Sequence, residues 1–497
     1  MRKFNYILLL SFITICSSCD DFLTREPISS IPTTSYPATE KDANALLAGM
    51  YDAIQGALSV NFYTWGDVRS DIVEKAGGAD DNLLNNSITA NHAAANWSNL
   101  YQVILSSNIL IKYVPDMELG DSKKNDILGQ AYAARALMYF YGLRNWGKMP
   151  LVTEPFENKP GQNMFVARSP IEDVEKRIED DLLMAQQLLE SITPSSCFYL
   201  NIGAVQGIMT DFYMWTHNYD KAIETSEYFL PENKCPFTYA EGATKWKEIF
   251  IKPEASKEPL FTLAWDYTED GRHGMFIEYG CSDRAAKYKV SESIWDEFVN
   301  RKNKDVRFAL TMDTVNLASQ YGAEIDMATY TSVTSPGAYY CCKYIEQNIA
   351  DNTYNLPSSV DYSIQVTLYR YTGVMLLRAE ALARRGNAED LTEAVEIVNK
   401  VRERVGYDIP ISPTATQDDI LDAIDLERQL ELWGEGVRWY DLVRQDRVIE
   451  VMDPVLKARG NENGFGDPQY ILWPIHRSAF EGNPLLVGDQ NPGYSES

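Results

Sequence analysis

The stretch from Leu368 to Arg447 constrains the fold more than any other part of this chain of 497 residues. Its first part is rich in small and apolar residues and stops at a glycine, which predicts a helix over 368–386. A second helix is expected over 391–405. A third begins near Gln417 and runs to Trp433, and Gly434-Glu-Gly436 separates it from a further helical segment that ends at Arg444. The second has one apolar face at the helical spacing, made by Ala394, Ile397, Val398 and Val401. Helices paired around a glycine turn are typical of helical-repeat scaffolds.

The rest of the chain supports a mostly helical fold. The apolar periodicity predicts further helices over 40–55, 97–114, 123–146, 169–189, 203–215 and 221–230. Ser169 is the expected N-cap of its helix, with Pro170 at the first helical position. Residues 61–96 and the tail beyond Arg447 are expected to be loops. Between 231 and 367, short alternating runs indicate short strands and loops, with one helix over 291–299. We therefore predict an all-α, irregular tetratricopeptide-like helical-repeat scaffold with a loop-rich, short-strand ligand-binding face.

The N-terminus carries a targeting signal. Two basic residues precede an apolar run from Phe4 to Ile15, which is too short to span a bilayer and predicts a signal peptide over residues 1–18. Small residues then lead directly into Cys19, a pattern that resembles the site at which a bacterial lipoprotein is cut and acylated. The alternative for Cys16 and Cys19 is a redox or zinc pair, but no second pair completes such a site. Residues 19–40, with three prolines, are expected to form the lipidated tether.

Charge and cysteine content exclude several classes of protein. The formal net charge of −26 and the lack of any Lys and Arg run argue against a nucleic-acid-binding protein. The expected partners are neutral, cationic or proteinaceous. The five cysteines beyond Cys19 have no regular spacing, so no disulfide framework is predicted.

Enzyme motifs are absent from the sequence. It contains no metalloprotease, nucleophile-elbow or phosphate-loop motif, and its four histidines are far apart, so no metal site and no cofactor are predicted. Glu427, Glu431 and Glu435 share one helix face, which is a possible arrangement for a glycosidase. Arginines alternate with them at positions 428, 438 and 444, which favours a structural ion-pair network instead.

Aromatic residues in irregular, polar segments are the candidate ligand contacts. Sugar rings stack on such side chains while nearby Asp and Asn bind the hydroxyl groups. The alternative for each aromatic is simple packing between helices. The candidates are Trp65, Trp265, Tyr267, Tyr279 and Tyr288.

A series of short landmarks extends along the whole chain beyond residue 18. The N-terminal ones are Cys19-Asp-Asp-Phe-Leu23, Arg69-Ser-Asp71, Trp97-Ser-Asn-Leu-Tyr101 and Trp146-Gly-Lys-Met-Pro-Leu-Val152. The C-terminal ones include Asp305-Val-Arg307, Leu377-Arg-Ala-Glu-Ala381, Gly436-Val-Arg-Trp-Tyr-Asp-Leu-Val-Arg444, Trp473-Pro-Ile475 and Asn491-Pro-Gly-Tyr494. In this order they resemble the SusD/RagB family of lipid-anchored, outer-surface nutrient-binding proteins of Bacteroidetes.

The resemblance implies a single domain over 41–497, with helical parts at 41–230 and 368–497 around the loop-rich part at 231–367. It implies a protein without catalytic activity that captures an oligosaccharide and passes it to a SusC-like TonB-dependent outer-membrane transporter. The implied location is the outer membrane, with the lipid anchor at Cys19 and the protein facing the cell exterior. Family members share no motif for glycan contacts, so the aromatic candidates above rest on local inference alone.

Three alternatives stay open at this point. RagB-like relatives handle peptides, and the acidic charge would suit a cationic peptide. An all-helical glycoside hydrolase would use Glu427 and Glu431 as its paired carboxylates. A purely structural lid would bind no soluble ligand. The stretch 368–447 is best interpreted as a scaffold clamp, in which ion pairs join the helices and hold the aromatic loops of 231–367.

Overall fold

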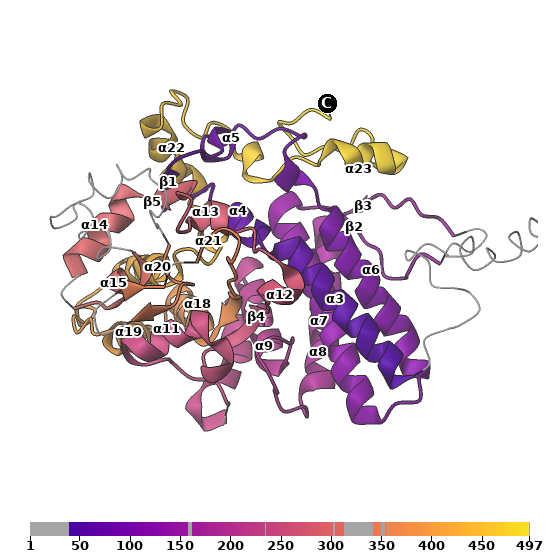
Figure 1. Ribbon diagram of the computed structural model, residues 1–497. Helices are drawn as coiled ribbons and strands as arrows, with labels where there is room; N and C mark the ends of the chain where they lie inside the picture. The colour runs from indigo at the N-terminus through magenta and orange to yellow at the C-terminus, as the bar shows by residue number, and fades with distance from the viewer. Residues whose placement is uncertain are drawn as a thin grey trace, which may run out of the picture.

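Four long helices from the first half of the chain pack side by side along one flank of the molecule. The computed structural model describes residues 39–157, 162–233, 235–301, 304–312, 341–348, 353–355 and 357–496. Along this flank α3 packs on α6, α6 on α7 and α7 on α8, as the indigo to purple ribbons of Figure 1 show. The helices of this half are α3 (Glu40–Leu58), α4 (Asn61–Gly66), α5 (Asp81–Leu84), α6 (Ser98–Tyr113), α7 (Asp121–Trp146), α8 (Ile171–Leu189), α9 (Ile202–Trp215) and α10 (Tyr219–Ser226).

Helix α7 forms the centre of this flank. From Ala131 to Trp146 all but one of its residues are buried, because α6 and α8 pack on it from two sides and α3 and α9 also contact it. Its alanines let these neighbours approach closely. The helix ends at Gly147, whose φ of 73° is accessible to glycine at little cost. The predicted helix over 123–146 is thus confirmed.

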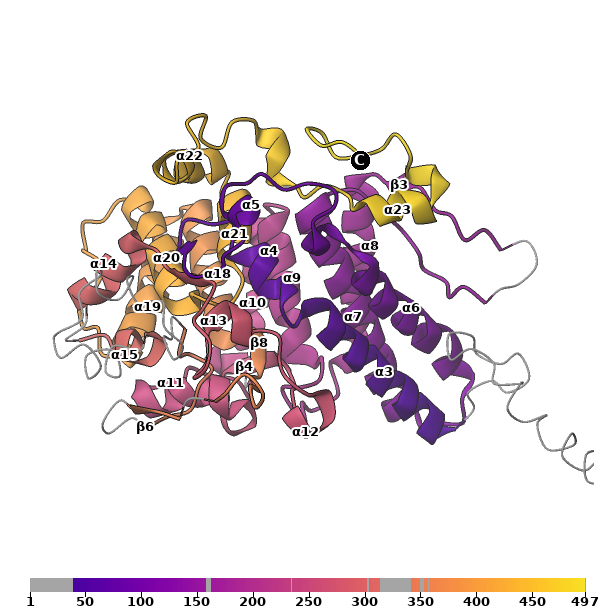
Figure 2. The same ribbon diagram turned by 45° about the horizontal axis from the view of Figure 1, so that its top comes forward.

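A second group of helices surrounds α18 on the opposite flank, drawn in orange in Figure 2. Helix α18 packs on α19, α20, α9 and α10, so it joins the two halves of the chain. Helix α20 begins at Gln417 as predicted, where Thr416 and Asp419 form a capping box. The helices of this part of the chain are α18 (Tyr371–Arg385), α19 (Ala388–Arg404), α20 (Gln417–Leu432), α21 (Arg438–Arg444) and α22 (Val448–Ala458). The last helix, α23 (Arg477–Gly482), returns to the first flank and lies near α6 and β3.

The segment between the two helical parts is rich in loops and short elements, as predicted. Its helices are α11 (Gly242–Ile251), α12 (Tyr267–Asp270), α13 (Phe276–Tyr279), α14 (Glu292–Arg301) and α15 (Arg307–Thr311). Among the described residues, the strands are β1 (Val73–Lys75), β2 (Met149–Pro150), β3 (Arg168–Ser169), β4 (Pro259–Leu263), β5 (Tyr288–Val290), β6 (Gln347–Asn348), β7 (Thr353–Tyr354) and β8 (Val366–Arg370). They pair antiparallel as β1 with β5, β2 with β3, β4 with β8 and β6 with β7. The all-α, tetratricopeptide-like fold class is confirmed.

Several predicted boundaries are wrong. The helix expected from Leu368 begins only at Tyr371, because residues 366–370 pair as β8 with β4. Ser169 belongs to β3 and caps no helix, and Pro170 occupies the N-cap position of α8. The segment 61–96 contains α4, β1 and α5 rather than loops alone, and α22 and α23 lie in the tail. Short elements of this kind form through tertiary packing, which local periodicity does not report.

Residues 1–38, with the predicted signal peptide, Cys19 and most of the tether, lie outside the described residues. Within the described ranges, no helix combines the length and apolar character that crossing a bilayer requires. The five described cysteines are free thiols.

Candidate functional site

An open groove lies between α3 and the loop that follows β4. One face of α3 packs into the core through Ala43, Leu47, Met50 and Ile54. Its opposite face is left open and forms one wall of the groove. The other wall contains Trp265 and the short helix α12, which lies beside α3 in both Figure 1 and Figure 2. The hollow between these walls has a volume of about 490 Å³, which is within the range of small-ligand sites.

The indole of Trp265 is half-buried and firmly held. Its Nε1–H donates a hydrogen bond to the carbonyl oxygen of Gly271 at 2.8 Å. The ring of His273 lies against it, with 4.2 Å between the ring centroids. Because burial lowers the pKa of His273 to about 3, the imidazole behind the indole is uncharged near neutral pH. Trp265 is therefore a pre-positioned aromatic surface on the wall of the groove.

Polar side chains surround this indole. The Gln55 amide donates to the carbonyl oxygen of Ala264 at 2.5 Å, and the Asn99 amide donates to that of Gly56 at 3.1 Å. Their remaining amide groups are available for hydroxyl groups of a ligand. The polar residues that line this hollow are Asp52, Gln55, Asn99, Gln102, Ser106 and Asp270. An aromatic plane beside several amides and carboxylates is the combination that sugar rings require.

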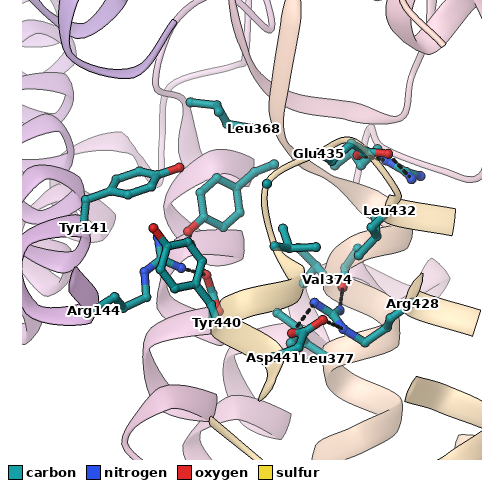
Figure 3. A pocket seen from close by; sticks show the side chains of 16 residues that line it. Tyr141, Arg144, Leu368, Val374, Leu377, Arg428, Leu432, Glu435, Tyr440 and Asp441 are labelled. Carbon is teal, nitrogen blue, oxygen red and sulfur yellow. Dashed lines mark hydrogen bonds and ion pairs between the residues drawn. The ribbon is translucent and has the colours of Figure 1, made fainter. Parts of the chain in front are cut away.

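A second, internal cavity lies where α7, α9, β8, α18 and α21 meet. Figure 3 shows it lined by charged and aromatic side chains that already have partners within the protein. Arg428 and Asp441 form an ion pair at 2.8 Å, and the Arg144 guanidinium lies 4.1 Å from the ring centroid of Tyr440. The volume is about 50 Å³, which leaves room for water molecules but not for a sugar ring. This cavity is part of the polar interior and not a ligand site.

The carboxylates of α20 are at the centre of a buried ion-pair network. Glu427 and Glu431 are both 0 % exposed. Arg307 contacts both of them, Arg301 and Arg402 contact Glu427, and Arg370 and Arg404 contact Glu431. Burial alone would raise the pKa of the Glu427 carboxyl, but the surrounding guanidinium groups lower it to about 2. The same arrangement holds the pKa of Glu431 well below its usual range. The structural interpretation of Glu427 and Glu431 is thus confirmed, but the arginines expected to pair with them are wrong. Arg428 pairs with Asp441, Arg438 with Asp71 and Asp425, and Arg444 with Glu380 and Asp441.

This network predicts a specific pH dependence of stability. A carboxyl whose pKa is lowered by folding stabilises the native state above its unfolded pKa of about 4.5, and this contribution is lost as the pH falls toward about 2. We expect Glu427→Gln to lower the free energy of unfolding by about 3 kcal/mol at pH 7. The difference in the free energy of unfolding between Glu427→Gln and wild type should narrow as the pH falls below about 4.5. Urea unfolding at a series of pH values measures this difference, and a difference that stays constant with pH would contradict the assignment.

Three of the five predicted aromatic contacts are buried. Trp65 is 1 % exposed on α4, and its Nε1–H donates to the carbonyl oxygen of Ala94. Tyr279 is 1 % exposed and donates its hydroxyl to the Gly434 carbonyl, while Tyr288 is 3 % exposed on β5. A ligand ring cannot stack on these side chains in this structure. They lie on α4, α13 and β5 and not in irregular segments, so the predicted placement is wrong. The polar residues around them gave a misleading signal.

The other two candidates are accessible. Tyr267 is 42 % exposed at the start of α12, and Trp265 lines the groove two residues before it. Tyr267 does not line the hollow, so a contact with ligand stays a prediction for it. The predicted set did not include the polar residues of α3, because the solvent-facing side of an amphipathic helix has the same pattern whether or not a ligand binds there. Asp52 and Gln55 of α3 line the groove but are not among the predicted contacts. The same holds for the aromatic Tyr199 across the groove.

Comparison with known proteins assigns the chain to a family. The model of the SusD family matches residues 238–494, which is just over half of the chain. The chain belongs to the SusD/RagB family. The rest of it is covered in part by a second family, described as starch-binding and associating with the outer membrane, which matches residues 21–214. Both family descriptions agree with the resemblance drawn from the landmark residues.

Relatives of SusD type extend over nearly the whole chain. SusD-like protein P38 of Formosa agariphila is 28% identical, over 99% of this chain and 100% of its own length. A SusD-like protein of Bacteroides ovatus is 22% identical, over 90% of this chain and 83% of its own. A solved structure described as a laminarin-binding SusD-like protein has a TM-score of 0.70 and 22% identity, and the match covers 92% of this chain and 100% of that chain. A SusD-like protein from Bacteroides fragilis reaches a TM-score of 0.74 at 17% identity, over 95% of this chain.

Proposed function

We propose that this SusD-family chain is a cell-surface, lipid-anchored binding protein that captures oligosaccharides and delivers them to a SusC-like TonB-dependent outer-membrane transporter. The observation that carries the proposal is the groove at α3, where the half-buried Trp265 faces amide and carboxylate side chains. A tryptophan plane stacks on the C–H face of a sugar, and the amides bind its hydroxyl groups. A related structure is named for binding laminarin, which is a carbohydrate.

Binding without catalysis is the activity that this arrangement supports. A glycosidase needs one carboxyl with a raised pKa and a second that can reach the sugar. Glu427 and Glu431 have lowered pKa values and no exposed surface, so they cannot act on a glycosidic bond. In the groove, Asp52 and Asp270 are both exposed to solvent. Both lie in the open, solvent-facing part of the groove rather than in the enclosed apolar surroundings in which a glycosidase holds its general acid.

Anchoring and delivery are the parts of the proposal that rest on the N-terminus and on the family. Cys19 follows an apolar segment and small residues, as acylated lipoproteins require. Two or more acyl chains on it would give stable membrane attachment. A family described as associating with the outer membrane supports this location. The transporter is the partner that membership of the SusD/RagB family implies.

The alternative ligand is a peptide, and one panel separates the two. The purified protein is titrated by calorimetry with neutral oligosaccharides, including laminarin and starch fragments, and with peptides of mixed sequence. We expect at least one oligosaccharide to bind at least about tenfold more tightly than any peptide, a difference of about 1.4 kcal/mol. Chromatography of the same mixtures should find the oligosaccharides uncleaved. Tight binding of peptides alone would favour the RagB-like alternative, and cleavage products would overturn the binding-only assignment.

A further inference from the structure

The groove along α3 extends well beyond Trp265. The hollow at Trp265 adjoins a second one of about 330 Å³, and the two share Asp52, Gln55 and Asp270. The second hollow shares Ala48 and Tyr199 with a third of about 510 Å³. Helix α3 forms a wall of all three, and between Asn44 and Gly56 it rises by about 18 Å. Together the three hollows form a long channel rather than a pocket for a single ring.

A second aromatic surface lies toward the far end of this channel. Tyr199 is 47 % exposed and lines both the second and the third hollow. Its ring packs edge-on against Tyr51, with 5.2 Å between the ring centroids. The Tyr51 hydroxyl accepts a hydrogen bond from the Leu200 backbone N–H at 2.8 Å and donates one to Gln130 at 2.6 Å. The segment that presents Tyr199 is therefore pinned to α3 and α7.

Two glycines of α3 leave space in the channel. Gly49 and Gly56 both line the hollow at Trp265, and a Cβ added at either position would meet no atom within 4 Å. Glycine inside a helix costs about 0.5–1 kcal/mol relative to alanine, and here no packing within the chain requires it. The open backbone at these positions fits a ligand that lies directly on the helix surface.

The charge of the channel restricts the ligand. Among the described residues, the charged side chains that line the first two hollows are Asp52 and Asp270. In the third hollow Lys123 is balanced by Asp126. The channel thus carries negative charge and offers no cluster of cations to pair with sulfate or carboxylate groups. An anionic chain would be repelled where it contacts α3.

We propose that this channel binds an extended, neutral oligosaccharide across two aromatic surfaces, Trp265 and Tyr199, and excludes sulfated and uronic-acid chains. The inference rests on the proposed function and adds the class and length of the ligand. A short fragment occupies the Trp265 end alone, whereas a longer chain reaches Tyr199. Affinity therefore increases with chain length until both surfaces are covered.

The test uses laminarin and starch oligosaccharides of increasing length, together with sulfated laminarin fragments, in calorimetric titrations of the purified protein. We expect Tyr199→Ala to weaken binding of long neutral chains by about tenfold, with short fragments unaffected and Tyr199→Phe close to wild type. Gly49→Ala should weaken binding of the long neutral chains, although the variant should resist urea unfolding at least as well as wild type does. Asp52→Asn should improve binding of the sulfated fragments. Met164→Ala, an exposed apolar residue that lines none of the three hollows, is the matched control.

The outcomes distinguish a failure of the proposed function from a failure of the extended channel. If no oligosaccharide binds wild type at all, the proposed function fails and this inference fails with it. If oligosaccharides bind but Tyr199→Ala has no effect that depends on chain length, only the extended channel is overturned. Sulfated fragments that bind wild type as tightly as neutral ones would overturn the charge selectivity. A loss of affinity in Met164→Ala as large as in Tyr199→Ala would also overturn the site.

Discussion

Replacing Glu431 by alanine is expected to lower the free energy of unfolding by about 3–5 kcal/mol. The carboxylate is 0 % exposed and accepts hydrogen bonds from Arg307 and Arg370 at 2.8 and 2.7 Å, and Arg404 also pairs with it. Without Glu431 these buried guanidinium groups lose their shared counter-charge. Leaving a buried charge unpaired costs more free energy than the intact ion pair contributes to stability. Urea unfolding followed by circular dichroism at pH 7 measures the difference.

The control for this prediction is Glu403→Ala. Glu403 is exposed on the neighbouring helix α19, and Lys400 is 4.0 Å away. An exposed pair of this kind contributes about 0–1 kcal/mol, so the control should unfold close to wild type. Glu431→Gln keeps the volume and one acceptor, and should be less destabilised than the alanine variant. A loss below about 1 kcal/mol for Glu431→Ala would show that the network is not needed for stability.

The same network explains why the clamp could be predicted from sequence. Glu427 and Glu431 are one helical turn apart and have arginines nearby in the chain, which predicts an ion-pair network. The nearby arginines at positions 428, 438 and 444 pair with other carboxylates, however. The partners that matter most, Arg307 and Arg370, come from segments more than 60 residues away, and spacing along a helix does not reveal them. Local patterns therefore predict that a network exists, and only the fold defines its members.

Candidate ligand contacts were harder to predict for a related reason. Trp65 and Trp265 each lie within two residues of an Asp, and their local sequences do not show which one is exposed. The fold buries Trp65 against Trp146, with 5.5 Å between the ring centroids, while Trp265 lines the groove on the loop after β4. Exposure of an aromatic side chain depends on which distant elements cover it. Helices with one apolar face, such as α8 and α19, carry that information locally, and loops do not.

Stability and ligand binding are located in different parts of the molecule. The buried ion pairs join α20 to β8, α15 and α19, whereas the groove is made by α3 and the loop after β4. Residues that line the groove take no part in the network. Variants in the groove should therefore change affinity without unfolding the protein, which makes the binding proposal directly testable by substitution.

The matched variants for the groove are Trp265→Ala, Trp265→Phe and Tyr267→Ala. Tyr267 lies on the same wall and is 42 % exposed but does not line the hollow, so its loss should change affinity less than about threefold. A larger loss in Tyr267→Ala would extend the site along α12 from Asp270 to Tyr267. Met164→Ala again serves as the control, because Met164 lines none of the three hollows.

We expect Trp265→Ala to weaken oligosaccharide binding by about 30-fold or more, which corresponds to about 2 kcal/mol. Tryptophans in preformed sites contribute at this level because they bury a large apolar plane without losing much conformational entropy. The hydrogen bond to Gly271 and the contact with His273 already fix the indole in place. Trp265→Phe keeps a smaller plane and should lose less. Calorimetric titration with the tightest-binding oligosaccharide of the panel measures the change in affinity. If Trp265→Ala binds it as tightly as wild type does, the groove is not the binding site.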